Sequence, residues 1–101
     1  MAIKELVESS IDENTVTIFS KSWCPYCKAS KTLFEREFPD VPTKILELDE
    51  MDEGSEIQAY LAQKTGQRTV PNIFVNQQHI GGNDATQAAF KNGQLKTLIA
   101  V

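Results

Sequence analysis

The segment Cys24-Pro25-Tyr26-Cys27 constrains this chain more than any other feature of its sequence. It follows an apolar run of β-forming residues, Val16–Phe19, and opens an amphipathic segment in which Pro25 suits the first turn of a helix. Both sulfurs are therefore expected one turn apart at a helix N-terminus, where unpaired backbone N–H groups and the helix dipole favour a thiolate. We predict that Cys24 is the nucleophile and that Cys27, one turn deeper, is a less exposed and less acidic resolving thiol.

Two other roles for the cysteine pair have less support in the sequence. A structural disulfide between residues so close in sequence would add only about 2 kcal/mol of stability. A zinc site needs about four ligands, whereas the chain contains two cysteines and one histidine, His79. We therefore expect redox chemistry and no metal, with Lys21 and Lys28 as the cations that lower the Cys24 pKa, and we expect His79 to be a surface strand residue.

Length, hydrophobicity and charge argue against a membrane protein, an exported protein and a nucleic-acid-binding protein. The 101 residues suffice for one domain, which we expect to span residues 1–101. No apolar run approaches the ~20 residues of a membrane span, and the charged N-terminus is unlike the apolar core of a signal peptide. The net charge of −4 argues against nucleic acid and anionic membranes as partners. We expect the protein to be a monomer. Without an export signal we also expect it in the cytoplasm, a reducing compartment in which the disulfide of a C-x-x-C pair is transient and catalytic.

Hydrophobic periodicity predicts the order β-α-β-α-β-β-α after a short N-terminal helix, followed by a last helical segment. The strand–helix–strand start implies a parallel pair joined by a crossover, and Asn76-Gln77 reads as a hairpin turn. We therefore expect an α/β fold around a small four-stranded mixed sheet. The predicted helices cover residues 2–10, 25–38, 55–64, 85–91 and 94–100, and the predicted strands cover residues 15–20, 44–48, 72–75 and 78–80.

Three motifs together resemble the glutaredoxin family of the dithiol type: Cys-Pro-Tyr-Cys, Thr69-Val70-Pro71 and Gly81-Gly82-Asn83-Asp84. The resemblance extends from about Asn14 to Ile99. It implies the thioredoxin-like (glutaredoxin) fold, with helices flanking the sheet, and a glutathione-dependent thiol–disulfide oxidoreductase. Many glutaredoxins have Thr or Tyr before the first cysteine, whereas this chain has Trp23.

The resemblance also implies a glutathione-binding groove. Lys21, Gln58 and Arg68 would reach the glycine carboxylate of glutathione, and Tyr26 would lie beside the bound tripeptide. From the residues alone, Lys21 could also be a solvated loop lysine, and Gln58 could also be an exposed helix residue.

Two loops would complete this groove. The family places a cis proline opposite the nucleophile. In this chain that proline would be Pro71, in the Thr69-Val70-Pro71 loop, and the backbone amide and carbonyl of Val70 would pair with the tripeptide. The amides of Gly82, Asn83 and Asp84 would meet the γ-glutamyl carboxylate, and Asp84 would accept the α-amino group. From the residues alone, Asn83 or Asp84 could simply cap the following helix.

The expected activity is the reduction of protein–glutathione mixed disulfides through Cys24 alone, and of protein disulfides through both cysteines. Glutathione is the expected co-substrate, with no prosthetic group, and the expected partners are glutathionylated and disulfide-containing proteins. Two alternatives remain. One is a thioredoxin-like reductase, which has no need of carboxylate sites at both ends of a groove. The other is a glutathione-ligated [2Fe–2S] carrier, which the stiff Pro25 disfavours.

Overall fold

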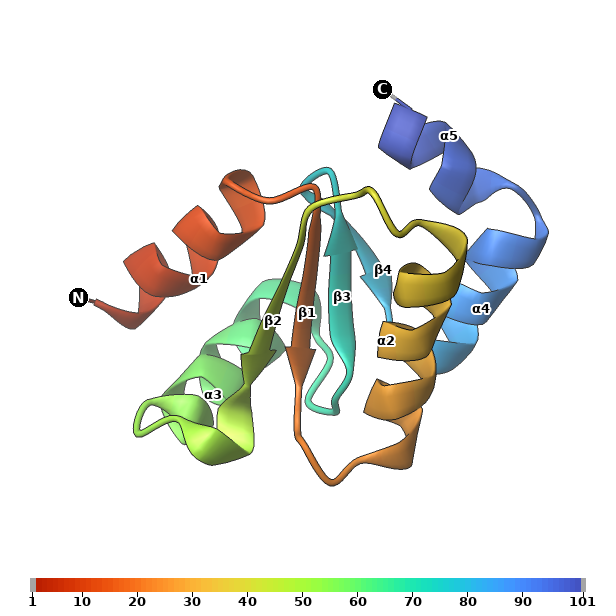
Figure 1. Cartoon of the computed structure of the whole chain (residues 1–101). Coiled ribbons are helices and arrows are strands. Elements are labelled where there is room, and N and C mark those ends of the chain that lie inside the picture. Colours follow the sequence, from red (N-terminus) through yellow and green to blue (C-terminus); the bar gives the residue numbers. More distant parts are fainter. Residues whose placement is uncertain (1, 101) are drawn as a thin grey trace.

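Within residues 2–100, which the computed structural model describes, four strands form one sheet in the order β2-β1-β3-β4 (Figure 1). Parallel pairing joins the first two strands in the chain, and antiparallel pairing joins the rest. The sheet is therefore mixed, as predicted. Residues 1 and 101, which the expected domain includes, lie outside the described part. The strands are β1 (Val16–Ser20), β2 (Thr43–Glu47), β3 (Asn72–Val75) and β4 (Gln78–Gly81).

Helices precede, connect and follow these strands. Periodicity predicted each α-helix, but it did not predict the single 3₁₀ turn, η1, that follows β2. Among the described helices, none is both long and apolar enough to cross a membrane. The elements are α1 (Ile3–Asp12), α2 (Pro25–Glu37), η1 (Leu48–Glu50), α3 (Gly54–Thr65), α4 (Asn83–Lys91) and α5 (Gln94–Ala100).

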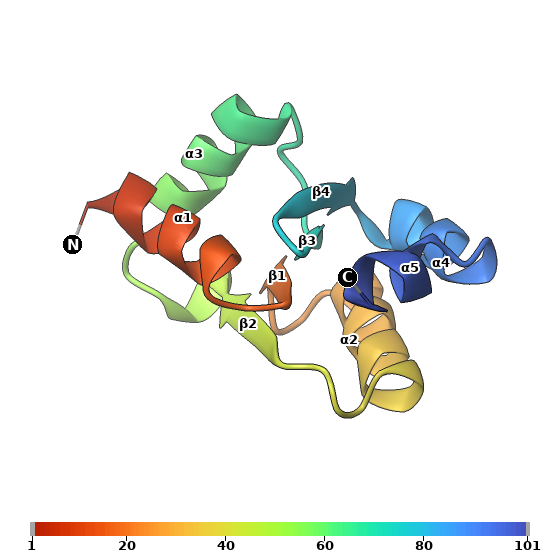
Figure 2. The same ribbon diagram turned by 90° about the horizontal axis from the view of Figure 1, so that it is seen from above.

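The helices cover both faces of the sheet, with α1 and α3 on one face and α2, α4 and α5 on the other (Figure 2). Alternating strand residues supply the two cores, because successive side chains of a strand point to opposite faces. On β1, Phe19 packs toward α1 and α3, and Ile18 packs toward α2 and α4. Both faces of β1 are thus buried, which explains its continuous apolar run.

Several predicted boundaries were wrong by one or two residues. The first helix continues to Asp12 instead of ending at Ser10, because Ile11 is buried one turn after Val7. The second strand ends at Glu47, because the chain turns into η1. The fourth helix begins at residue 83 instead of 85, so that the Gly-Gly turn leads directly into it.

The buried face of α2 also differs from the one that the apolar pattern predicts, in which Ala29 is buried and Lys31 faces water. Ser30 is fully buried, whereas Ala29 is only half-buried. Lys31, predicted to face water, is half-buried and forms a salt bridge of 2.7 Å with Glu47 of β2. The helix is therefore rotated so that one polar, small side chain and one lysine face inward. This rotation brings Lys31 onto the same face as the first cysteine, two turns away.

The beginning of α3 lies unusually close to η1. A Cβ placed on Gly54 would lie 1.8 Å from the backbone oxygen of Leu48, a distance that only glycine permits. The helix ends at Gly66, which adopts the left-handed conformation that glycine tolerates at a helix C-terminus. The close approach at Gly54 holds η1 beside the carboxyl ends of β1 and β2, which is the edge where open α/β sheets carry their ligand sites.

Candidate active site

Cys24 occupies the N-cap position of α2, directly after the loop that leaves β1. Its sulfur accepts a hydrogen bond from the backbone N–H of Cys27 at 3.4 Å, as a capping side chain does. Pro25 fills the first helical position, where its missing N–H costs nothing. The local sequence thus places the first sulfur at the positive end of the helix dipole, as predicted.

The surroundings of Cys24 lower the pKa of its thiol below the ordinary value. Burial is the largest influence and raises this pKa, since only 7% of the residue is exposed. Hydrogen bonds from the Cys27 thiol and from the backbone N–H groups of Cys27 and Tyr26 outweigh burial, together with the charge of Lys31. The nearby cation is therefore Lys31, and the expectation that Lys21 and Lys28 supply this charge is not supported by the structure.

Cys27 lies one turn deeper and is fully buried. Burial, the largest influence, raises the pKa of its thiol, although the N–H of Lys21 donates to the sulfur at 3.5 Å. Both cysteines are free thiols. The predicted asymmetry is confirmed: the pKa falls at Cys24 and rises at Cys27, so that the first is the stronger candidate for the nucleophile.

The loop before Cys24 is held by a carboxylate from η1. Asp49 accepts hydrogen bonds from both the backbone N–H and the hydroxyl of Ser22. These bonds also lower the pKa of Asp49. The clamp links residues 27 positions apart in the chain and fixes the path that presents Trp23 and Cys24. Sequence analysis missed this contact, because a turn after β2 was not predicted.

The Thr69-Val70-Pro71 loop faces Cys24 from the other side of the site. The Val70–Pro71 peptide bond is cis, as the resemblance implied. The carbonyl oxygen of Val70 lies 4.0 Å from the Cys24 sulfur. The Gln67 side-chain amide donates to the carbonyls of Thr69, at 2.9 Å, and Pro71, at 2.8 Å. Gln67, which sequence analysis did not single out, therefore pins the loop on both sides of Val70.

The turn into α4 forms the third side of the site, after the loop before Cys24 and the cis-proline loop. Gly82 is the N-cap residue and no side chain caps the helix, so the possibility that Asn83 or Asp84 does so was wrong. The Asn83 side chain instead accepts a hydrogen bond of 2.8 Å from the buried Ser30 hydroxyl, which ties α4 to α2. The N–H groups of the first turn consequently have neither an intrahelical acceptor nor a capping side chain.

The structure brings most of the predicted residues together. A hollow of about 390 Å³ is lined by residues from all three motifs: Tyr26, Thr69, Val70, Pro71, Gly82, Asn83 and Asp84, with Ala85. Lys21 and Gln58 line a neighbouring hollow of about 240 Å³. Gln58 also donates to the carbonyl of the exposed Arg68 at 2.7 Å, which joins α3 to the loop that follows it.

His79 does not line either of these hollows. His79 is an exposed residue of β4, in agreement with the predicted surface strand position, and a nitrogen of its ring lies 2.9 Å from the Asn72 side-chain oxygen on the neighbouring strand. In the part of the chain that the structure describes, no three His, Cys, Asp or Glu side chains cluster in a way that could hold a metal ion.

Comparisons with known proteins agree with this site. A family model described as Glutaredoxin matches residues 16–80. Glutaredoxin-1 of Rhizophagus irregularis is 51% identical over 98 residues, covering 97% of this chain and 95% of that protein. Glutaredoxin-1 of Saccharomyces cerevisiae is 46% identical over 95 residues, covering 92% of this chain and 86% of that protein.

Solved structures show the same architecture. A buckwheat glutaredoxin–glutathione complex is similar with a TM-score of 0.91 at 36% identity, covering 97% of this chain and 87% of that one. Wheat glutaredoxin is similar with a TM-score of 0.88 at 45% identity, covering 99% and 92%. This chain belongs to the glutaredoxin family, and it has the thioredoxin-like fold of that family. Its paired thiols are accordingly those of a thiol–disulfide oxidoreductase.

Proposed function

We propose that this chain reduces protein–glutathione mixed disulfides and protein disulfides at the expense of glutathione. One observation carries the proposal: the acidified sulfur of Cys24 lies 4.0 Å from the Val70 carbonyl, beside the hollow formed by the cis-proline loop and the first turn of α4. This combination offers a thiolate next to an exposed peptide edge and a helix N-terminus. An anionic, extended peptide disulfide suits all three.

Glutathione fits this arrangement by its two carboxylates. The first-turn N–H groups of α4 suit the γ-glutamyl carboxylate, and Asp84 suits the α-amino group next to it. At the other end, Lys21, Gln58 and Arg68 suit the glycine carboxylate. Between them, the Val70 backbone pairs with the cysteinyl residue. The related buckwheat glutaredoxin was crystallised as a complex with glutathione, which supports this choice of ligand.

In the monothiol route, the Cys24 thiolate attacks the glutathione sulfur of the mixed disulfide. A new sulfur–sulfur bond forms, the old one breaks, and the protein thiolate leaves and takes a proton from solvent. The thiolate of a second glutathione then attacks the glutathione sulfur on Cys24 and releases glutathione disulfide. A low Cys24 pKa helps both steps, because it raises the thiolate fraction and makes Cys24 a better leaving group.

In the dithiol route, Cys24 attacks a protein disulfide and forms a mixed disulfide with one of its sulfurs. Cys27 then attacks the Cys24 sulfur, closes the Cys24–Cys27 disulfide and releases the second protein thiol. Two molecules of glutathione reduce that disulfide and leave as glutathione disulfide. Neither route requires a prosthetic group, and both suit a reducing compartment such as the cytoplasm.

A coupled assay tests the proposal. Oxidation of NADPH is followed with a glutathionylated peptide as substrate, in one arm with glutathione and glutathione reductase and in the other with thioredoxin reductase. We expect turnover in the glutathione arm only. Turnover in the thioredoxin reductase arm alone would instead identify a thioredoxin-like reductase, and visible absorbance of the purified protein would favour the cluster carrier.

A further inference from the structure

Trp23 is more exposed than the fold requires. Among residues 2–100, the large apolar side chains that are exposed are Trp23, Tyr26 and Ile45, at 68%, 65% and 38%. The first two flank Cys24 in sequence, while Cys24 itself is 7% exposed. Tryptophan normally buries most of its surface, and an exposed aromatic side chain beside a reactive group is typical of an interface anchor.

Trp23 and Tyr26 border different hollows. Tyr26 lines the hollow formed by the cis-proline loop and α4, where we place the γ-glutamyl and cysteinyl parts of glutathione. Trp23 lines the neighbouring hollow with Lys21 and with Asp49 of η1. Only the glycine end of glutathione would reach that hollow, so most of the indole is left for another group. In a mixed disulfide, that group is the protein attached to glutathione.

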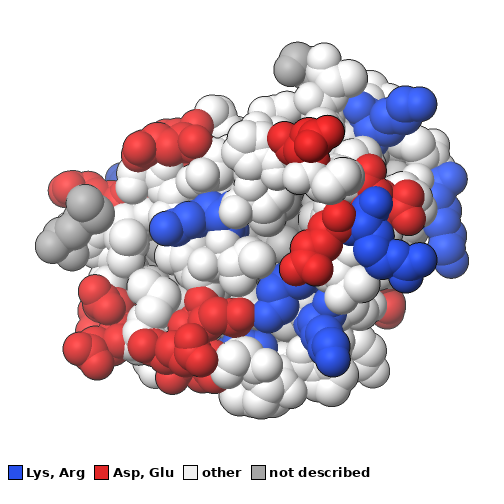
Figure 3. All heavy atoms as spheres, viewed as in Figure 1, with Lys and Arg blue, Asp and Glu red and all other residues white. Residues whose placement is uncertain are grey.

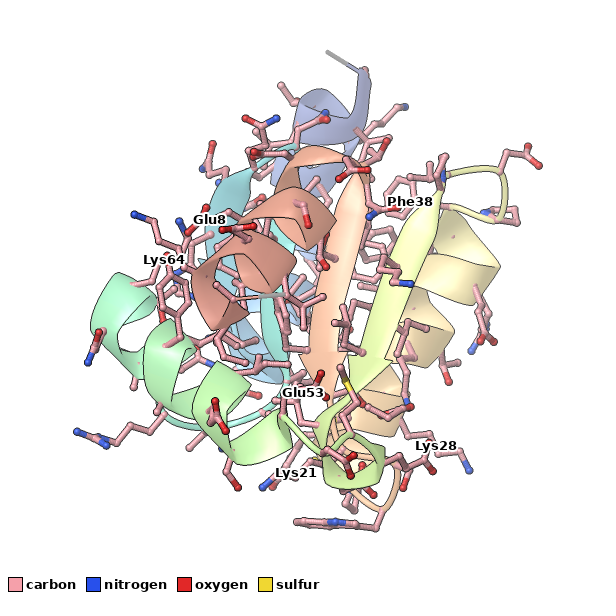
Figure 4. The ribbon with its side chains drawn as sticks, turned by 90° about the vertical axis from the view of Figure 1, so that its left-hand side faces the viewer. Glu8, Lys21, Lys28, Phe38, Glu53 and Lys64 are labelled. Atoms are coloured by element: carbon pink, nitrogen blue, oxygen red, sulfur yellow. The ribbon has the colours of Figure 1, made fainter. Side chains whose placement is uncertain are left out.

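The surroundings of the Trp23 indole favour the binding of a cation over its ring. The Lys21 ammonium lies 5.8 Å from the centre of the Trp23 ring, which shows that a cation can reach the ring face. Acidic side chains gather over η1 and the start of α3, at the lower left of Figure 3, and Figure 4 shows Glu53 at the same end of the molecule as Lys21. The exposed carboxylates of η1, of the turn that follows it and of the first turn of α3 are Asp49, Glu50, Asp52, Glu53 and Glu56.

We propose that Trp23 docks the protein half of the mixed disulfide and selects targets that carry Arg or Lys next to the modified cysteine. The inference rests on the proposed function. When the glycine carboxylate of glutathione engages Lys21, the indole face is released, and a cationic side chain of the target takes the place of the ammonium. The carboxylates of η1 and α3 add long-range attraction, which salt screens.

Two peptides test the proposal. Both carry one glutathionylated cysteine, flanked by Arg in the first peptide and by Glu in the second. We expect the wild-type protein to reduce the Arg peptide with a kcat/KM about two- to fivefold higher than the Glu peptide, with the ratio falling in high salt. In W23A the ratio should fall to the smaller value that the carboxylates alone support, and in W23F it should lie between W23A and the wild type, since phenylalanine keeps a ring face.

Three controls keep the test specific. The mixed disulfide of glutathione with free cysteine lacks a protein half, so W23A should reduce it within about twofold of the wild-type rate. The double variant D52N/E53Q should lower the ratio, because it removes two of the exposed negative charges near Trp23. The double variant E35Q/E37Q removes the same charge from exposed positions on α2 and should leave the ratio unchanged.

The outcomes separate the two proposals. If neither peptide is reduced, the proposed function itself is wrong. If the wild-type protein reduces both peptides at equal rates, or if W23A keeps the full preference, the docking role of Trp23 is wrong and the glutathione-dependent activity stands.

Discussion

Cys24 and Cys27 differ in chemistry because the same helical turn exposes them to different surroundings. The first sulfur sits at the N-cap, where backbone N–H groups point at it and Lys31 adds charge. The second sulfur is enclosed, and burial opposes its ionisation. The Cys24 thiol is therefore the more easily ionised of the two, which favours it as the nucleophile.

The first prediction concerns the pH dependence of this thiolate. Because the Cys24 pKa is lowered and only the thiolate is nucleophilic, its alkylation by iodoacetamide should rise and level off at a lower pH than that of an ordinary thiol. Cys27, whose pKa is raised, should react only at higher pH. Mass spectrometry of each cysteine measures both curves. A Cys24 midpoint at the ordinary thiol value would contradict the account of an activated thiolate.

The second prediction concerns the two ends of the glutathione groove. The variants K21A and D84A should each raise the apparent KM for glutathione about two- to tenfold, because each loses a partly screened charge-assisted contact. Circular dichroism should show an intact fold. K44A and D12A remove the same charges from exposed positions on β2 and α1, and they serve as matched controls. Unchanged glutathione kinetics in both groove variants would show that the groove is misplaced.

At the scale of the elements, the site depends on loops that side chains hold in place. Asp49 clamps the loop before α2, and Gln67 clamps the cis-proline loop. Ser30 connects α2 to the start of α4 through Asn83. The Asp49 and Ser30 contacts join separate elements, whereas Gln67 holds its own loop from within. The loop before α2 and the start of α4 are therefore positioned by the packing of the elements around them.

The third prediction tests the Gln67 clamp. Q67A removes two hydrogen bonds to the carbonyls on either side of Val70, so the apparent KM for a glutathionylated peptide should rise about three- to tenfold. The value of kcat should change less than twofold, because no hydrogen bond joins Gln67 to either sulfur. Q63A, at an exposed position of α3, is the matched control. An unchanged KM, or a shifted pH profile of Cys24 alkylation, would argue against this role.

The fourth prediction tests the approach of α3 to η1. G54A places a methyl group 1.8 Å from the Leu48 carbonyl oxygen, so one of the two elements must move. We expect a loss of about 2–3 kcal/mol in the free energy of unfolding, measured by urea denaturation. S55A, at the adjacent exposed position, should change it by less than about 0.5 kcal/mol. Equal stability of the two variants would show that the contact yields without cost.

At the scale of the whole molecule, sequence patterns predicted the elements better than their contacts. The helices and strands follow from periodicity, and the cis state of Pro71 followed from the resemblance to a family. The Asp49 clamp depends on how an unpredicted turn packs, and residue spacing carries no signal for it. The role of Lys31 was accessible, because a residue seven positions after Cys24 lies on the same helix face.

The same difference applies to the candidate site. The motifs indicated which residues line the main hollow, because each motif has a local backbone chemistry that the sequence displays. Gln67 was missed because a glutamine in a loop has no distinguishing pattern until the carbonyls that it contacts are placed. Trp23 was visible as a departure from the family, but its exposure and its distance from Lys21 required the structure.

The separate replacement of the two cysteines tests the central claim most directly. On a glutathionylated peptide, with glutathione and glutathione reductase, C24S should be inactive, because no nucleophile remains at the helix start. C27S should retain the activity or exceed it, because glutathione from solution resolves the intermediate and the unproductive Cys24–Cys27 disulfide cannot form. On an intramolecular protein disulfide, both variants should lose activity. If C27S were as inactive as C24S on the glutathionylated peptide, the protein would be an obligate dithiol reductase, contrary to the mechanism proposed for it.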